Sequence, residues 1–164
     1  MMTVIAAILI PAMGLAQSKP ISDLFDKYQG KDGFTTVIVN EDAFKLISNM
    51  EKTEGELKQP LTRIRKVRVL AQDDDSVGAG LNFYDELQGS MDFSVYKELV
   101  VVKESDQDVR VLARDSNGRL SELLVIVGGD DNVLVWIEGD FTLEELSQLS
   151  QLGGIEGLDI LKGM

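Results

Sequence analysis

The fold is decided by residues 109–152, VRVLARDSNGRLSELLVIVGGDDNVLVWIEGDFTLEELSQLSQL. Apolar and polar residues alternate in three runs, which is typical of β-strands, and the turn sequences DSNG and GGDDN separate these runs. In the first turn, Gly118 is expected to supply the positive φ of a three-residue hairpin loop with a bulge, which pairs positions of equal parity. Thr142-Leu143-Glu144-Glu145 is a capping box that opens a helix. The stretch therefore predicts a three-stranded antiparallel meander followed by a helix.

This register gives the meander two apolar faces. Val111 and Val125 belong to the first face, which is the candidate core. The second face carries Leu112, Leu124, Ile126, Leu134 and Trp136, rimmed by Arg110, Arg114, Glu122 and Glu138. If helices cover only the opposite face, the second face is an exposed apolar patch, which commonly marks a binding surface for a protein partner or a second copy. If the N-terminal or mid-chain helices cover it, it is core, and the sequence leaves both alternatives open.

Upstream of the meander, the sequence predicts further helices and strands. A helix over residues 22–29 precedes a β-branched strand over 34–39, and Asn40 is a natural N-cap for the helix that follows. The next strand covers residues 64–70, so the order strand, helix, strand suggests a parallel βαβ crossover.

Residues 81–88 and 93–103 carry apolar residues at helical spacing and predict two helices, or one interrupted at Gly89. We therefore expect an α+β fold with a mixed sheet, a βαβ unit, the C-terminal meander and helices mainly on one face. A ferredoxin-like arrangement fits this order of elements.

The first residues are typical of a secretory signal peptide. Residues 1–16 contain an apolar run followed by Pro11, and Gly14 and Ala16 occupy the positions that signal peptidase prefers. Cleavage after Ala16 would leave a single domain over residues 17–164 in the periplasm or outside the cell. No Lys or Arg precedes the apolar run, so a buried first helix is the alternative. The run is too short to span a membrane, which takes about 20 apolar residues.

Composition excludes many functions. The 164 residues include no Cys and no His, so disulfides, thiolate nucleophiles, and histidine bases or ligands are excluded. The net charge of −12 disfavours nucleic acid as a partner. Accordingly, no catalytic residue, metal site or cofactor is predicted.

One basic cluster stands out in this acidic chain: Arg63, Arg65, Lys66 and Arg68. Such a cluster can hold an anion, a lipid head group or an acidic partner. The simpler interpretation is that these residues neutralise neighbouring carboxylates, because alternation within the strand divides them between two faces.

The chain is similar to a family of exported Gram-negative envelope proteins known as domain of unknown function number 4252. The similarity runs from about Phe34 to Lys162 and rests, in order, on FTTVIVNEDAFKLIS, IRKVRVL, FYDEL, YKELVVVKE, RVLARDSNGRLSELLVIV, VLVWIEGDFTLEEL and IEGLDIL. It implies a signal peptide, an α+β fold and no assigned activity. Family members are often encoded near extracytoplasmic sigma factors, which implies an envelope-stress setting. Trp136 departs from the smaller or polar residue expected there.

We therefore predict an exported, non-enzymatic binding module that acts through the face around Trp136. The alternatives are a regulatory envelope-stress factor and a carboxylate-dependent hydrolase of an envelope polymer. The hydrolase would use acids from residues 73–75 or from Asp130 and Asp131. It requires two carboxyl groups that converge in a cleft, about 5 to 10 Å apart for glycoside chemistry.

Overall fold

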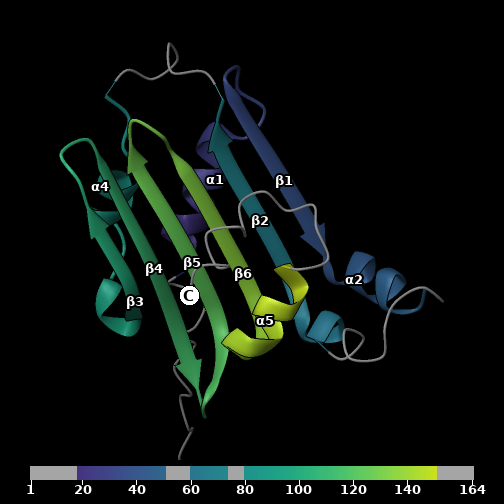
Figure 1. The fold of residues 1–164 in the computed structure, drawn as a ribbon. Coiled ribbons are helices and arrows are strands. Elements are labelled where there is room, and N and C mark those ends of the chain that lie inside the picture. The colour runs from purple at the N-terminus through teal and green to yellow at the C-terminus, as the bar shows by residue number, and fades with distance from the viewer. Residues whose placement is uncertain (1–17, 51–59, 74–79, 151–164) are drawn as a thin grey trace, which may run out of the picture.

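The computed structural model describes residues 18–50, 60–73 and 80–150, and these form one antiparallel sheet with helices packed on it (Figure 1). The strands of this described part lie in the order β1-β2-β6-β5-β4-β3. Their bounds are Phe34–Asn40 (β1), Ile64–Gln72 (β2), Lys97–Lys103 (β3), Gln107–Ser116 (β4), Arg119–Gly129 (β5) and Val133–Phe141 (β6). The predicted α+β class is confirmed. The predicted signal peptide lies outside the described residues.

Helices cover both faces of the sheet. Helices α1 (Lys19–Tyr28) and α4 (Phe83–Gln88) pack on one face, whereas α2 (Glu41–Ser48) and α5 (Leu143–Ser150) pack on the other. In Figure 1, α1 and α4 lie behind the sheet and α5 lies in front of it. The expectation that helices lie mainly on one face is therefore wrong. Among the described residues, no helix has the length and apolar character needed to cross a bilayer.

Strands β1 and β2 are antiparallel neighbours, so the predicted parallel βαβ crossover is wrong. Phe34 pairs with Gln72 and Asn40 with Lys66. Helix α2 has eight residues and rises about 12 Å. A seven-residue strand spans roughly 23 Å, so α2 alone does not return the chain to the start of β1, and β2 instead begins beside the end of β1, where Asn40 pairs with Lys66. The ferredoxin-like arrangement is not confirmed either, because β3 to β6 follow one another without an intervening helix.

The second predicted mid-chain helix, over residues 93–103, is also wrong. A short 3₁₀ turn, Phe93–Val95, leads directly into β3, which pairs with β4. The run Val100-Val101-Val102 is β-branched and favours a strand over the helix that its spacing suggested. The meander consequently has four strands rather than three.

The predicted parity of the β4–β5 pairing is confirmed. Val109 pairs with Val127 and Val111 with Val125, so positions of equal parity face each other. The turn has two residues instead of three, because both Asn117 (φ 56°) and Gly118 (φ 80°) adopt positive φ. The bulge lies in β5, where the register shifts by one residue at Ser121.

Two polar devices define the ends of the elements. The capping box is confirmed: the Glu145 backbone N–H donates to Thr142 Oγ1 (3.1 Å), and the Thr142 N–H donates to Glu145 Oε2 (2.9 Å). At the opposite end of the sheet, the buried Asn132 side chain accepts from the Phe83 N–H (2.9 Å). Its amide nitrogen donates to Gln72 Oε1 (2.8 Å) and to the carbonyls of Leu81 (3.1 Å) and Gly129 (2.9 Å). Asn132 thus ties α4 to the ends of β2 and β5.

Candidate functional site

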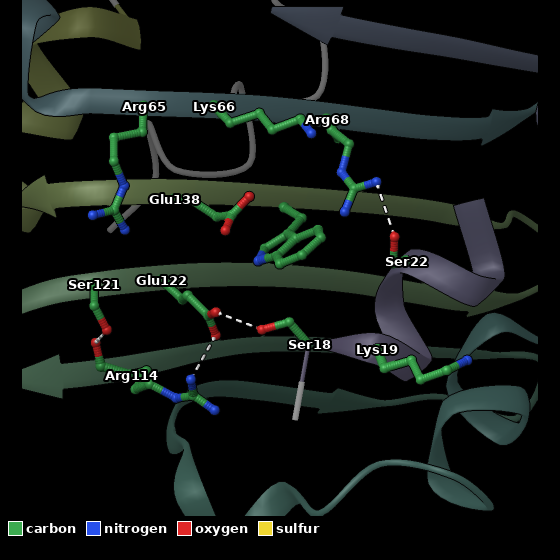
Figure 2. A pocket seen from close by; sticks show the side chains of 11 residues that line it. Ser18, Lys19, Ser22, Arg65, Lys66, Arg68, Arg114, Ser121, Glu122 and Glu138 are labelled. Atoms are coloured by element: carbon green, nitrogen blue, oxygen red, sulfur yellow. Dashed lines mark hydrogen bonds and ion pairs between the residues drawn. The ribbon is translucent and has the colours of Figure 1, made fainter. Parts of the chain in front are cut away.

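An open cavity of about 550 Å³ lies between the start of α1 and the sheet (Figure 2). Four neighbouring strands, β2, β6, β5 and β4, form its floor. Its lining consists of Ser18, Lys19, Ser22, Arg65, Lys66, Arg68, Arg114, Ser121, Glu122, Trp136 and Glu138. We refer to it below as the α1 pocket.

The α1 pocket is positively charged, although the chain as a whole is acidic. Five of its lining residues are Lys or Arg and two are Glu, so the excess is three positive charges. The whole chain carries a net charge of −12. This concentration of cations attracts anions locally, against the field of the rest of the molecule.

A bulge in β2 places three members of the predicted basic cluster in the pocket. Ile64 pairs with Gly139 and Lys66 pairs with Glu138, so Arg65 is an extra residue on β2. Regular alternation would point Arg65 to the opposite face of the sheet, but here Arg65, Lys66 and Arg68 all line the pocket. The expectation that alternation divides the cluster between two faces is therefore correct only for Arg63.

Arg63 fulfils the simpler expectation of neutralising carboxylates. Its Nε lies 3.7 Å from Glu145 Oε1, and its Nη1 lies 4.0 Å from Asp140 Oδ2. In contrast, Arg65, Lys66 and Arg68 make no ion pair with any residue that the structure describes.

Arg68 is a buried cation held by aromatic rings. Its guanidinium carbon lies 4.2 Å from the ring centroid of Trp136 and 4.6 Å from that of Phe25. The residue is only 7 % exposed, and burial lowers the pKa of Arg68, while Glu138 and Asp26 oppose this effect. Its one hydrogen bond to a described residue is a long contact of 3.5 Å from Nη1 to Ser22 Oγ, and its buried Nε has no partner there. Ring faces stabilise such a charge less than a carboxylate or phosphate does.

Glu122 is the well-satisfied acid of the pocket. It accepts hydrogen bonds from Ser18 Oγ (3.0 Å) and from the Tyr96 hydroxyl (2.6 Å). Arg114 Nη1 lies 3.6 Å from its second oxygen. Burial, and then the hydrogen bond to Glu122, raise the pKa of Tyr96, so this hydroxyl remains a donor.

Glu138 is the unsatisfied acid. In the strand register, Glu138 lies opposite Lys66 of β2 and opposite Glu122 of β5. Its carboxyl group forms no hydrogen bond or ion pair with the described residues. Burial, and then the charge of Glu122, raise the pKa of Glu138, whereas Arg68, Lys66 and Arg65 lower it. Within the described part of the chain, the pocket thus combines three cations that form no ion pair with one carboxyl group that forms none.

The residues predicted from sequence as a binding surface divide into three groups. Helices α1 and α4 cover the apolar residues of the second face, so the structure shows the alternative in which that face is core. These fully buried residues are Leu112, Leu124, Ile126 and Leu134. Arg110 lies over the Tyr84 ring (4.1 Å) and pairs with Glu98 (2.5 Å). Only the third group, Trp136 and Arg114, lines the α1 pocket. That these residues form a binding surface remains a prediction.

The acids proposed for hydrolysis lie elsewhere. Asp73 accepts a hydrogen bond from Thr35, and Asp131 accepts one from Gln107 (3.3 Å). Neither they nor Asp130 line the α1 pocket, and residues 74 and 75 lie outside the described residues. Within the described part of the chain, no group of three or more acidic side chains is placed to hold a metal ion.

The family described as "Domain of unknown function (DUF4252)" matches residues 28–149, most of the chain. The chain belongs to this family. The similarity noted in the sequence is thereby confirmed, and the sheet that floors the pocket lies inside the DUF4252 segment. Ser18, Lys19 and Ser22 precede that segment. Neither the curated proteins nor the solved structures contain a match to the chain.

Proposed function

We propose that this DUF4252 protein is an exported, non-enzymatic binding domain of the cell envelope, and that its α1 pocket binds a small ligand with an anionic group. The observation that carries the proposal is Arg68, a buried guanidinium in the pocket floor with no carboxylate partner among the described residues. A buried cation is costly unless it is paired, and an anionic ligand supplies the missing partner.

The size and lining of the pocket support a small molecule. Its volume of about 550 Å³ is within the range of small-ligand sites, roughly 300 to 1,000 Å³. The aromatic ring of Trp136 offers an apolar surface, and Ser22 and Ser121 offer hydroxyl groups for orientation. A macromolecular partner would instead need a broad surface.

The proposal of export rests on residues 1–16. Cleavage after Ala16 would leave α1 intact, because α1 begins at Lys19. Expression of the full chain in a Gram-negative host, followed by fractionation and N-terminal sequencing, tests this point. A mature chain that starts at Gln17 in the periplasm is expected, whereas an uncleaved chain in the cytoplasm contradicts export.

One observation favours the hydrolase as a second candidate. Glu122 and Glu138 are neighbours on adjacent strands in the same pocket, and burial raises the pKa of Glu138, as a general acid requires. We prefer binding because the oxygens of Glu122 already accept from Ser18 and Tyr96. A carboxylate engaged in this way is a poor nucleophile or base. A regulatory role in envelope stress is compatible with binding, since a sensor also needs a ligand site.

The test of anion binding uses Trp136, the single tryptophan of the chain, as its reporter. The purified mature protein is titrated with phosphate, sulfate or acetate, and with glycerol as a neutral control. A saturable change in tryptophan emission with the anions alone is expected, weakening as salt is added. No change with any anion at millimolar concentration would refute the proposal. Hydrolysis of chromogenic glycosides by the same preparation would favour the second candidate.

A further inference from the structure

We propose that the ligand of the α1 pocket is a zwitterion, in which a primary ammonium group binds beside Glu122 and Glu138 while the anionic group binds beside Arg68. This inference rests on the proposed function, because the same pocket must first bind an anion. It adds the second half of the ligand's chemistry.

The first argument is the state of Glu138. It is partly buried, it adjoins the like charge of Glu122 across the strand pair, and it has no hydrogen-bond or ion-pair partner among the described residues. Like charges directly opposite each other on neighbouring strands are destabilising. A ligand ammonium between the two carboxyl groups would relieve this repulsion and donate hydrogen bonds to both.

The second argument is the separation of charge within the pocket. The three cations that form no ion pair with a described residue, Arg65, Lys66 and Arg68, come from β2, whereas the two acids come from β6 and β5 (Figure 2). A purely anionic ligand near Arg68 would lie close to Glu138 and be repelled by it. A zwitterion can align its own dipole with that of the pocket, so both of its charges are stabilised.

The strand register sets the scale of the ligand. The guanidinium of Arg68 lies over the ring of Trp136, which is two residues along β6 from Glu138, or about 7 Å of strand. An ammonium and an anionic group separated by a few bonds, on the order of 5 to 7 Å, match this separation. A bare divalent metal ion fits less well, because the site has two carboxyl groups and three adjacent cations.

This chemistry has two sources in a cell envelope. Amino acids and short peptides combine an ammonium with a carboxylate, and aminoalkyl phosphates such as 2-aminoethyl phosphate combine it with a phosphate. The shared requirement is a primary ammonium a few bonds from an anion. The two arms of the experiment distinguish these sources.

The experiment compares matched pairs of ligands by Trp136 fluorescence and calorimetry. One arm uses ω-amino acids from 3-aminopropanoate to 6-aminohexanoate against the unsubstituted carboxylates of equal chain length. The other uses 2-aminoethyl phosphate against ethyl phosphate. We expect the amino compound of each pair to bind about tenfold more tightly, the scale of one charge-assisted hydrogen bond, with an optimum in chain length. The arm whose best amino compound binds more tightly identifies the source.

The Glu138→Gln variant tests the assigned residue. It should remove the advantage of the amino compounds while leaving the unsubstituted anions bound equally or more tightly, since a negative charge has gone. Glu144→Gln, on α5 across the sheet, is the matched control and should change nothing. Circular dichroism checks the fold of both variants.

The possible failures are distinct. If the amino and unsubstituted compounds bind equally, the zwitterion inference is wrong and anion binding stands. If Glu138→Gln weakens both classes equally, the inference is also wrong, because Glu138 then acts on the whole pocket. If no compound binds, the proposed function fails with it.

Discussion

The guanidinium carbon of Arg68 lies 4.2 Å from the centroid of the Trp136 ring, its partner in the register of β2 and β6. Phe25 of α1 closes the other side at 4.6 Å. The charge is therefore enclosed by a helix on one side and the sheet on the other. Trp136, the single tryptophan of the chain, contacts the residue proposed to bind the anion.

Replacement of Arg68 by Met separates binding from folding. Because the variant removes a buried charge that has no ion-pair partner among the described residues, and keeps apolar contact with both rings, we expect its free energy of unfolding to stay within about 1 kcal/mol of wild type or to rise. The anion-dependent change in Trp136 emission should weaken at least about tenfold. Arg63→Met, on the opposite face, is the matched control and should keep the full response. Equal responses in Arg68→Met and wild type would exclude Arg68 as the anion ligand.

Replacement of Glu138 by Gln should change how stability depends on pH. The pKa of Glu138 is raised in the folded state, so its contribution to stability is fully present below the unfolded pKa, about 4.3, and is lost as pH rises through the folded pKa. At pH 7 the variant should therefore be more stable than wild type, by less than about 1 kcal/mol because the site is partly open to water. The gap should close near pH 4. Urea unfolding at both pH values measures it, and a less stable variant at pH 7 would contradict the expected desolvation.

Replacement of Gly139 by Ala should damage the β2 bulge. A Cβ at this position would lie 2.5 Å from the carbonyl oxygen of Arg63, which is backbone and cannot move freely. We expect a loss of roughly 1 to 3 kcal/mol in unfolding free energy, together with weaker anion binding, because the bulge presents Arg65 to the pocket. Gly89→Ala, with open space around its Cβ and helical backbone angles, should be nearly neutral. An unchanged free energy of unfolding in Gly139→Ala would mean that β2 and β6 can move apart to accommodate the added methyl group at little energetic cost.

Replacement of Asn132 by Ala should destabilise the fold without changing the α1 pocket. Four hydrogen bonds of a buried amide are lost, and several of their partners stay buried, so a loss of about 2 to 4 kcal/mol is expected. Asn49→Ala, at the exposed end of α2, is the control. Below the unfolding transition, anion affinity should match that of wild type. A reduced affinity would show that the Asn132 end of the sheet is coupled to the α1 pocket.

The meander could be predicted because its signals are local. The turn residues Asn117 and Gly118 locate the hairpin, and the alternation of the flanking strands indicates that positions of equal parity share a face, as Val109 and Val127 do. The two-residue turn and the position of the bulge at Ser121 were not predicted. The strand of residues 97–103 could not, because Tyr96, Leu99 and Val100 satisfy a helical spacing equally well. Its pairing with β4 decides the outcome.

The pocket could not be predicted because it depends on contacts between distant residues. Ser18 and Glu122 are separated by 104 positions, and nothing local to either indicates their hydrogen bond. The basic cluster was visible, but a single bulge at Arg65 overrides the alternation that was expected to divide it. Helices cover both faces of the sheet because α1 packs on the face opposite to α2 and α5. The helical pattern of α1 does not specify the face of the sheet on which this helix packs.

The docking of α1 has a thermodynamic consequence. One wall of the pocket belongs to α1 and the floor to the sheet, so the binding-competent state exists only while that helix is in place. A ligand bound there therefore stabilises the docked position of α1. It protects the amide protons of α1 from hydrogen exchange by the same factor by which it favours the docked state. Ligand occupancy and the docking of this one helix would then be a single coupled equilibrium.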